Sequence, residues 1–313
     1  MQAILFCRCI CLCLHHNIIV YFYTMKQQLF YEIAGHCLLI DTPDTEITAG
    51  LIPAFHPFRV NNDGNTEPIF RFSGNKPILI PKIAPVEKTN FEGTLFNVFH
   101  VAGGVTISMK GNDKEYHLFA SSDRKTFNCD LSLTNPEESR FLLYFVRTAY
   151  GMAAIHHQTI KIHASVTEKG GKALVFMGKS GIGKSTHSRL WKEFVPGSTL
   201  LNDDEPIVRL LDDGRVKVYG APWSGSTPCY RNASAEVAAF VHLYQSPENR
   251  LTRLNGIDAF TSLFQSSALL RSDRKGRKLI FDLISGILER VPSYRLDNRP
   301  DREAVSLTGT LMV

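Results

Sequence analysis

The feature that most constrains this chain of 313 residues is a glycine-rich segment behind a short apolar run. Residues 173–177 are all apolar, and residues 178–185 read GKSGIGKS, which fits the pattern G-x-x-x-x-G-K-[ST] at every fixed position. The sequence that follows is predicted to be a helix. A strand, a glycine-rich turn and a helix in this order gather backbone N–H groups and a helix N-terminus around one point. The segment therefore predicts a phosphate-binding loop rather than a turn that binds nothing.

Each fixed position of this loop has a physical reason. The glycines let the backbone curl so that its N–H groups point at phosphate oxygens. Lys184 is expected to reach the β- and γ-phosphates of a nucleotide, and Ser185 to offer its hydroxyl to Mg²⁺. The implied cofactors are ATP and Mg²⁺. The residues expected to bind the nucleotide are Gly178, Ser180, Gly181, Gly183, Lys184, Ser185 and Thr186.

Composition narrows the class of protein. A hydrophobic content of 44% and a charged content of 21% are typical of a soluble globular protein, and the length fits one or two domains. The net charge of +5 comes without a long basic stripe, so nothing argues for nucleic acid as a partner. The densest basic run, RSDRKGRK at 271–278, is interpreted as a solvated turn between two helices rather than a docking site for an acidic partner.

The first 24 residues differ from the rest of the chain. They are apolar, but Arg8 and two histidines interrupt them, and no charged start or A-x-A-like cleavage site is present. Four of the seven cysteines lie within the first thirteen residues, which does not resemble a disulfide framework. We expect residues 1–24 to be an extension outside the fold, with a signal or membrane anchor as the alternative. A cytoplasmic protein whose folded part begins near Met25 is the resulting prediction.

Residues 25–134 form a region of short β-rich runs separated by prolines and by Asn-Gly or Gly-Asn pairs. No long helix fits this pattern, and no motif in it has a chemical role. The prediction for 25–134 is a β-rich N-terminal domain.

The spacing of apolar residues changes to that of a helix at residues 135–157. Asn135 can cap a helix, Pro136 suits its first position, and apolar residues from 141 to 153 recur on one helical face. Two strands joined by the tight turn KGGK follow, so the strand that feeds the phosphate loop is the second arm of a hairpin. Most phosphate-loop NTPases feed the loop from a parallel strand of βαβ units. The predicted fold class is therefore α/β with a mixed sheet of α+β character.

An acidic run, LLNDDEPIVRL at 200–210, follows the loop helix closely. Phosphoryl transfer needs an acid to hold Mg²⁺, and it gains from a carboxylate that accepts the proton of the attacking hydroxyl. Asp203 and Asp204 could divide these two tasks. The alternative is an acidic surface turn.

The sequence lacks the further motifs that several classes of phosphate-loop protein carry. A switch GTPase needs N-K-x-D after the loop, but the single Asn-Lys pair, at residues 75–76, precedes it. A transporter ATPase needs a signature like L-S-G-G-Q, which is absent. A RecA-like motor would carry more βα units after the loop. Kinase chemistry is the interpretation that survives.

The ordered set KIHASV, FMGKSGIGKST, NDDE and YGAPWSG resembles HPr serine kinase/phosphorylase and its relatives, a branch of the phosphoenolpyruvate carboxykinase-like phosphate-loop fold. The set lies within residues 160–226. With the preceding helix and the segment VPSYRLDNRPDREAV, which resembles the family's closing strand and helix, the likeness extends over about residues 136–313. It implies a kinase domain at 135–313 with a phosphoenolpyruvate carboxykinase-like core.

The resemblance also implies roles for individual residues. Asp203 is the candidate base, Asp204 and Ser185 are the candidate metal ligands, and His163 lies beside the transferred phosphate; the two aspartates could be exchanged. His163 could also be an ordinary strand histidine whose neighbours satisfy it.

The segment YGAPWSGSTPCYRN at 219–232 contains Trp223, which we expect to be exposed, and such a loop can close over a bound nucleotide. Arg231 in this segment could stabilise the charge of the transferred group, with an ordinary surface turn as the alternative.

The predicted activity is transfer of the γ-phosphoryl of ATP to an alcohol, a serine-type hydroxyl of a protein, a peptide or a small molecule. The N-terminal region does not resemble the regulatory domain of HPr kinases, and no copy of their docking segment follows Leu251, so the sequence does not choose the acceptor. The alternatives are a nucleotide-binding sensor without transfer and a phosphoenolpyruvate carboxykinase-like activity. Nucleic acid is not an expected partner, and neither is a membrane apart from residues 1–24. A homo-oligomer is compatible with the sequence.

Overall fold

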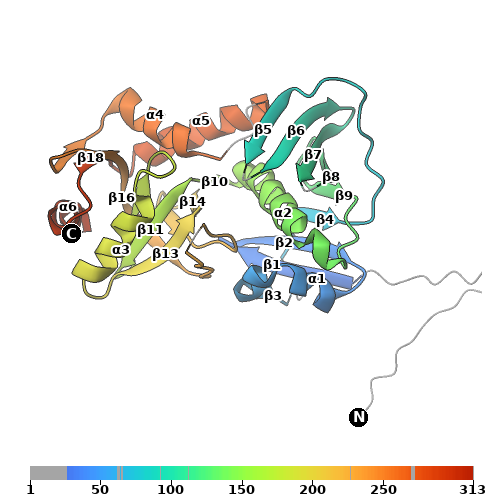
Figure 1. Cartoon of the computed structure of the whole chain (residues 1–313), viewed down its shortest axis with the longest axis horizontal. Coiled ribbons are helices and arrows are strands. Elements are labelled where there is room, and N and C mark those ends of the chain that lie inside the picture. Colours follow the sequence, from blue (N-terminus) through green and yellow to red (C-terminus); the bar gives the residue numbers. More distant parts are fainter. Residues whose placement is uncertain are drawn as a thin grey trace, which may run out of the picture.

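The computed structural model describes residues 27–61, 64, 66–91, 93–111, 113–225, 227–268 and 272–312 (Figure 1). Within these residues the strands form two sheets of nine strands each. We call them the N-terminal sheet, built from β1 to β9, and the loop sheet, built from β10 to β18. The predictions for residues 1–24 lie outside the described residues.

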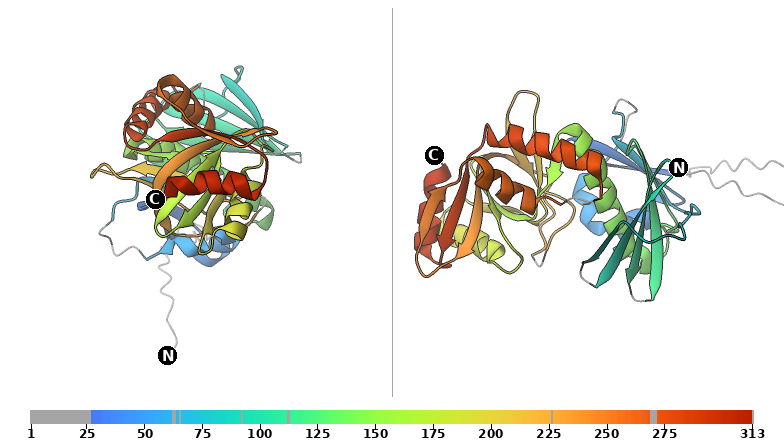
Figure 2. Two further views of the ribbon diagram at one scale, coloured as in Figure 1. Left: turned by 90° about the vertical axis from the view of Figure 1, so that its left-hand side faces the viewer. Right: turned by 90° about the horizontal axis from the view of Figure 1, so that it is seen from above.

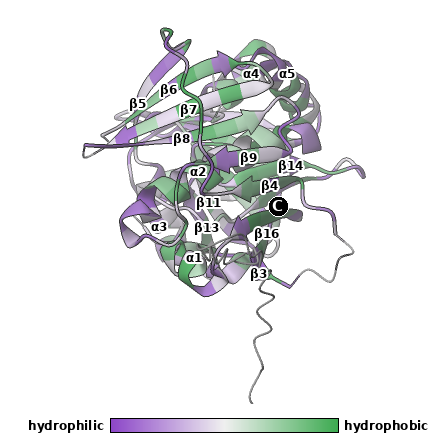
Figure 3. Ribbon diagram, turned by 90° about the vertical axis from the view of Figure 1, so that its right-hand side faces the viewer, coloured by the Kyte–Doolittle hydropathy of each residue, from purple (hydrophilic) through white to green (hydrophobic). Residues whose placement is uncertain are grey.

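The N-terminal sheet confirms the predicted β-rich region. Its strand order is β3-β1-β2-β4-β9-β8-β7-β6-β5. The pairs β2–β4 and β4–β9 are parallel, whereas the remaining pairs are antiparallel. Hydrophilic and hydrophobic residues follow one another along β5 to β8 (Figure 3). Its strands are β1 (Gln27–Ile33), β2 (His36–Thr42), β3 (Arg59–Val60), β4 (Phe70–Ser73), β5 (Glu87–Phe91), β6 (Thr94–Val101), β7 (Gly104–Gly111), β8 (Lys114–Ser121) and β9 (Thr126–Cys129).

Helices accompany this sheet. The short helix α1 (Thr45–Leu51) and the 3₁₀ turn η1 (Pro53–Phe58) follow β2. The predicted helix at 135–157 is present as η2 (Pro136–Glu138), α2 (Ser139–Ala154) and η3 (Ile155–His157). Asn135 caps it as expected, because its side chain accepts a hydrogen bond of 3.1 Å from the backbone N–H of Glu137.

The apolar face of α2 packs into the same core as the N-terminal sheet. Phe145, Ala149 and Ala153 on this face are buried together with Phe72, Phe127 and other side chains of the sheet. The prediction for 135–313 grouped this helix with the phosphate loop by its position in the sequence. In the fold α2 joins the two sheets, since Ile207 of the loop sheet and Trp223, which follows β15, also belong to this core.

The loop sheet confirms that the strand before the phosphate loop is the second arm of a hairpin. β11 and β12 are antiparallel and are joined by Gly170 and Gly171, which have φ of 60° and 80°. β12 is parallel to β16, and β16 is parallel to β18, so the sheet is mixed. The strands are β10 (Thr159–Lys161), β11 (Ala164–Lys169), β12 (Lys172–Met177), β13 (Thr199–Asp204), β14 (Ile207–Leu210), β15 (Val216–Tyr219), β16 (Ser234–Gln245), β17 (Arg250–Arg253) and β18 (Ser293–Asn298).

One strand prediction needs correction. The sequence pattern predicts one continuous strand, TIKIHASVTE, before the turn KGGK, but this segment is divided into β10 and β11. β10 pairs with β14, whereas β11 lies between β12 and β13. The break falls at Ile162 and His163, so His163 lies directly before the first residue of β11.

Helices cover both faces of the loop sheet. Side chains alternate along β12, so Leu174 and Phe176 face α3 (Lys184–Phe194) and α6 (Arg302–Gly309). Val175 and Met177 face α4 (Gly256–Ser266) and α5 (Arg274–Leu288) instead. Figure 2 shows α5 extending between the two sheets, with its first residues on the side of the N-terminal sheet. The helices predicted after residue 251 and the closing strand and helix are confirmed.

The basic run at 271–278 differs from its prediction as a turn. Its residues from Arg274 onward lie in the first turns of α5, and Asp273 caps this helix by accepting a hydrogen bond of 2.9 Å from the N–H of Gly276. In the described part of the chain, no helix is both long enough and apolar enough to cross a membrane.

Candidate active site at the phosphate loop

The phosphate loop connects β12 to α3 at one end of the loop sheet. Gly178, Gly181 and Gly183 have φ of 140°, 77° and 110°, a backbone region that side chains disfavour. Lys184 turns back over the loop, and its Nζ donates to the carbonyl oxygens of Gly178 (3.0 Å) and Lys179 (3.2 Å). Burial lowers the pKa of the Lys184 ammonium. The loop thus encloses a cation, as a site for phosphate requires.

The other predicted loop residues lie around this turn. Ser180 is exposed in the loop, and Thr186 lies half-buried in the first turn of α3. Ser185, also in that turn, is exposed, and its Oγ donates a hydrogen bond of 2.8 Å to Oδ1 of Asp203. This bond joins the phosphate loop to the acidic run.

The strand order explains why these residues meet. Ser165 of β11 lies opposite Phe176 of β12 on one side and opposite Asp203 of β13 on the other. Since β11 is antiparallel to both neighbours, the end of β12 and the end of β13 lie at the same edge of the sheet. The acidic run and the phosphate loop therefore emerge side by side.

His163 is the third predicted residue at this edge. Ala164 lies opposite Asp204 in the sheet, and Nδ1 of His163 is 3.6 Å from Oδ1 of Asp204. The side chain of His163 is 40% exposed, whereas that of Asp204 is 14% exposed. His163 and Asp204 therefore lie next to each other, with the imidazole more exposed than the carboxylate.

The geometry favours exchanging the roles of the two aspartates. A metal ion at the loop would contact the hydroxyl of Ser185 and a neighbouring carboxylate. The carboxylate bonded to Ser185 is that of Asp203, not that of Asp204. Asp204 faces His163 and Arg147 instead.

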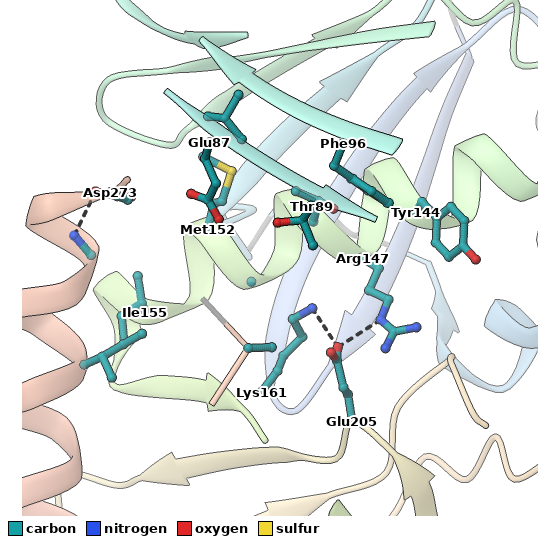
Figure 4. Close-up of a pocket in the computed structure, with 16 residues that line it drawn as sticks. Glu87, Thr89, Phe96, Tyr144, Arg147, Met152, Ile155, Lys161, Glu205 and Asp273 are labelled. Atoms are coloured by element: carbon teal, nitrogen blue, oxygen red, sulfur yellow. Dashed lines mark hydrogen bonds and ion pairs between the residues drawn. The ribbon is translucent and has the colours of Figure 1, made fainter. Parts of the chain in front are cut away.

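Arg147 was not singled out from the sequence, yet it binds the acidic run from α2. Its Nη2 donates to Oδ2 of Asp204 (2.8 Å), and its Nε donates to Oε2 of Glu205 (2.9 Å). Nζ of Lys161 reaches the same Oε2 at 2.8 Å (Figure 4). No local pattern could have identified this group, because its members come from α2, β10 and the end of β13.

The charges in this group are buried together. Burial alone would raise the pKa of the Glu205 carboxyl, but Lys161 and Arg147 outweigh it and hold that pKa well below its usual range. Burial lowers the pKa of Lys161, although Glu205 opposes the effect. The group is thus a set of mutually dependent ion pairs, and removing one member leaves another buried charge without compensation.

Trp223 is a correction to the sequence analysis, which expected it to be exposed. Its side chain is 1% exposed and lies in the core with Phe55 and Tyr150, whose ring centroids are 6.3 and 5.6 Å away. Its Nε1 donates a hydrogen bond of 2.7 Å to the carbonyl of Glu205. A large apolar ring with one donor is stable in a core once that donor is satisfied. Trp223 therefore anchors the segment 219–232 instead of covering a ligand.

Arg231 is not brought to the phosphate loop. Its Nη1 donates to Oγ1 of Thr199 (2.9 Å) and to the carbonyl of Leu200 (2.7 Å). These residues begin β13, whereas Asp203 lies near its end, and three residues of strand span roughly 10 Å. The contacts of Arg231 are those of a residue that fixes the segment 219–232 to the sheet, and they give no support to the predicted catalytic role.

His242 is another residue at this edge that sequence analysis missed. It lies opposite Met177, directly before the phosphate loop, and its Nδ1 is 2.6 Å from Oγ of Ser262. Burial lowers its pKa, and the charge of Lys184 acts in the same direction. A lone histidine in an apolar strand carries no sequence signal that separates this position from an ordinary core site.

Comparison with known proteins adds little to this geometry. No protein-family model matches the chain, and no curated protein matches it. Among solved structures, it is similar to the HPr(Ser) kinase/phosphatase from Coxiella burnetii, with 15% sequence identity and a TM-score of 0.29, over 49% of this chain and 87% of that chain. A similarity of this strength carries no functional argument, so the function is argued from the site.

Proposed function

We propose that this chain is an ATP- and Mg²⁺-dependent phosphotransferase that moves the γ-phosphoryl group to an alcohol, a serine-type hydroxyl of a protein, a peptide or a small molecule. In this proposal the loop sheet is the core of a phosphoenolpyruvate carboxykinase-like phosphate-loop kinase. The observation that carries it is the hydrogen bond of 2.8 Å between Ser185 and Asp203. This bond joins the glycine-rich loop to the acidic run, which supports a shared site for phosphate and metal.

Ser185 and Asp203 fit a magnesium ion. A hydroxyl and a carboxylate are hard oxygen ligands of the kind that Mg²⁺ takes alongside nucleotide phosphates. When bound there, the ion would stabilise the negative charge of the phosphates. Lys184 and the N-terminus of α3 supply further positive charge to the same point.

Asp204 is placed to accept the proton of the acceptor alcohol. As the oxygen of the alcohol forms its bond to the γ-phosphorus, the bond between that phosphorus and the β,γ-bridging oxygen breaks and ADP leaves. The alcohol proton passes to a carboxylate oxygen of Asp204. His163, on the open side of Asp204, faces the transferred group, while Arg147 holds Asp204 from the buried side.

A transfer assay tests this proposal. The full chain is incubated with Mg²⁺ and γ-labelled ATP, together with a bacterial lysate separated into protein and small-molecule fractions. Label should enter an acid-stable ester in one fraction, and Asp204→Asn should abolish this while ATP binding remains. Asp203→Asn should also abolish transfer and should weaken the Mg²⁺ dependence of ATP binding. Asp213→Asn, in the exposed turn between β14 and β15, is the matched control and should transfer normally.

Other outcomes would identify the alternatives. Tight ATP binding without label in either fraction would favour a nucleotide-binding sensor. Release of CO₂ from oxaloacetate in the presence of nucleotide would favour the carboxykinase-like activity. Normal transfer by Asp204→Asn would rule out its role as the base.

A further inference from the structure

A cavity of about 280 Å³ lies between the N-terminal sheet and the loop sheet (Figure 4). Its walls come from β5, β6, α2 and α5, and its floor is formed by Arg147, Lys161 and Glu205. The residues that line it include none from the phosphate loop. Cavities at the junction of two folded parts are common positions for small-molecule sites.

The walls are mostly apolar. The side chains that face the cavity from above the floor are Phe96, Val98, Met152, Ile155 and Ile280. An apolar cavity of roughly 150 Å³ accommodates benzene. The present volume therefore fits a single ring or a short chain with a few more atoms attached.

The position of Lys161 at the floor is unfavourable for stability in two ways. Gly151 lies within α2 beside it, and a Cβ at that position would lie 2.7 Å from Cε of Lys161. Glycine inside a helix is less stable than alanine, and an ammonium group loses solvation when it is buried. Both losses occur at one point, where the ammonium of Lys161 lines the cavity and is bonded to Glu205. Such costly charged positions are typical of functional sites.

The floor presents more donors than acceptors. Lys161 has three N–H groups, and its carboxylate partner is Glu205 at 2.8 Å. Oε2 of Glu205 already accepts from Arg147 as well. Figure 4 shows the Lys161 side chain rising from the floor toward Thr89 and Met152. A ligand group that accepts hydrogen bonds and carries negative charge would complement this arrangement.

The two other carboxylates that line the cavity are already bound. Glu87 accepts from the N–H and the hydroxyl of Ser272 at 2.8 and 2.9 Å. Asp273 accepts from Arg124 at 3.2 Å and caps α5. Both carboxylates are therefore already hydrogen-bonded to residues near the start of α5 or to Arg124.

We propose that this cavity binds a small amphipathic carboxylic acid, with its ring or short chain between the apolar walls and its carboxylate on the Lys161 ammonium. This inference is independent of the proposed phosphotransferase activity, since none of its contacts involves the phosphate loop. Arg147 nevertheless joins the floor of the cavity to Asp204.

Calorimetry with the full chain and three probes of one shape tests the proposal. The probes are 4-phenylbutyrate, 4-phenylbutanol and 4-phenylbutylamine. We expect the acid to bind at least tenfold more tightly than the alcohol, and the amine to bind more weakly than both. Lys161→Met should abolish the preference for the acid, because it removes the ammonium and keeps much of the stem.

Two variants on β5 keep the test valid if Lys161→Met fails to fold. Thr89 is exposed and lines the cavity, so Thr89→Trp should obstruct it and weaken binding of the acid at least fivefold. Lys88 is also exposed but does not line the cavity, so Lys88→Trp should bind like the wild type. The proposal is overturned if the acid does not bind, if all three probes bind equally, or if Thr89→Trp leaves binding unchanged.

Discussion

The two sheets have the same number of strands, yet among the described residues the loop sheet alone gathers the proposed catalytic groups at an edge. In the loop sheet β11 begins where β12 and β13 end, which brings together His163, the phosphate loop and Asp203. In the N-terminal sheet the hairpins between β6 and β8 end in tight turns, such as those at Gly103 and Asp113, which have φ of 78° and 62°. The position of strand ends, rather than composition, decides which sheet carries the site.

The N-terminal sheet contributes to the site indirectly. It buries the apolar face of α2, and this packing directs Arg147 toward Asp204 and Glu205. The comparison therefore predicts two kinds of defect. Changes in the loop sheet should abolish chemistry, whereas changes at the junction with the N-terminal sheet should first reduce stability.

The largest expected effect is that of Lys184→Ala. Because Lys184 is the cation enclosed by the phosphate loop, its removal should weaken ATP binding and reduce transfer by at least 100-fold, on the order of the loss seen when one charge-stabilising donor is removed from an active site. Binding by calorimetry and the transfer assay would measure this. Lys110→Ala, an exposed lysine on β7, is the matched control in the other sheet and should have no effect. Unchanged transfer by Lys184→Ala would remove the phosphate-loop assignment.

Arg147→Met tests the contribution of α2. It leaves Asp204 and Glu205 with one cation fewer in a buried group, which should lower the free energy of unfolding by about 3 kcal/mol. Urea denaturation would measure the change. Arg140→Met, an exposed position on the same helix, should change it by less than about 1 kcal/mol. Equal effects of the two substitutions would show that α2 does not stabilise the site.

One buried histidine in each part of the molecule predicts that the free energy of unfolding depends on pH. Burial lowers the pKa of His36 in β2 to about 3, and burial lowers that of His187 in α3 to about 4. The folded state binds fewer protons than the unfolded state, whose histidines titrate near pH 6.5. The stability that each neutral, buried histidine contributes is therefore present above that pH and is lost below it. Between pH 7 and 5 each histidine should cost about 2 kcal/mol of unfolding free energy.

Single substitutions assign this loss to one part of the molecule. His36→Gln and His187→Gln should each reduce the difference in unfolding free energy between pH 7 and 5 by about 2 kcal/mol. His100→Gln, at an exposed position, should not alter it. If both variants keep the full pH dependence of the wild type, these histidines are not the groups that titrate.

Arg231→Ala should have the smallest effect. Its guanidinium contacts the beginning of β13 and not the loop, so transfer should fall by less than about threefold and stability by about 1 kcal/mol, the value of ordinary hydrogen bonds. Steady-state transfer rates of Arg231→Ala and of the wild type would measure this loss. A loss comparable to that of Lys184→Ala would restore the catalytic role that the sequence pattern assigned to Arg231.

The sequence by itself determined the local features of the site. The glycine spacing at 178–183 requires a loop with positive φ, and the apolar run before it requires a buried strand, because both properties depend on a few adjacent residues. The hairpin and the capped helix at 135–157 were predicted for the same reason. Asp203 and Asp204 could be recognised since they lie soon after the loop.

Only the tertiary structure decided which side chains meet. The bond between Ser185 and Asp203, the ion pairs of Arg147, and the burial of Trp223 depend on strand order and on packing between segments distant in the sequence. The contacts of Arg231 with the beginning of β13 likewise follow from packing between segments that are distant in the sequence. Periodicity and spacing report which residues share a face or a turn, whereas contacts between separate elements follow from how the elements pack.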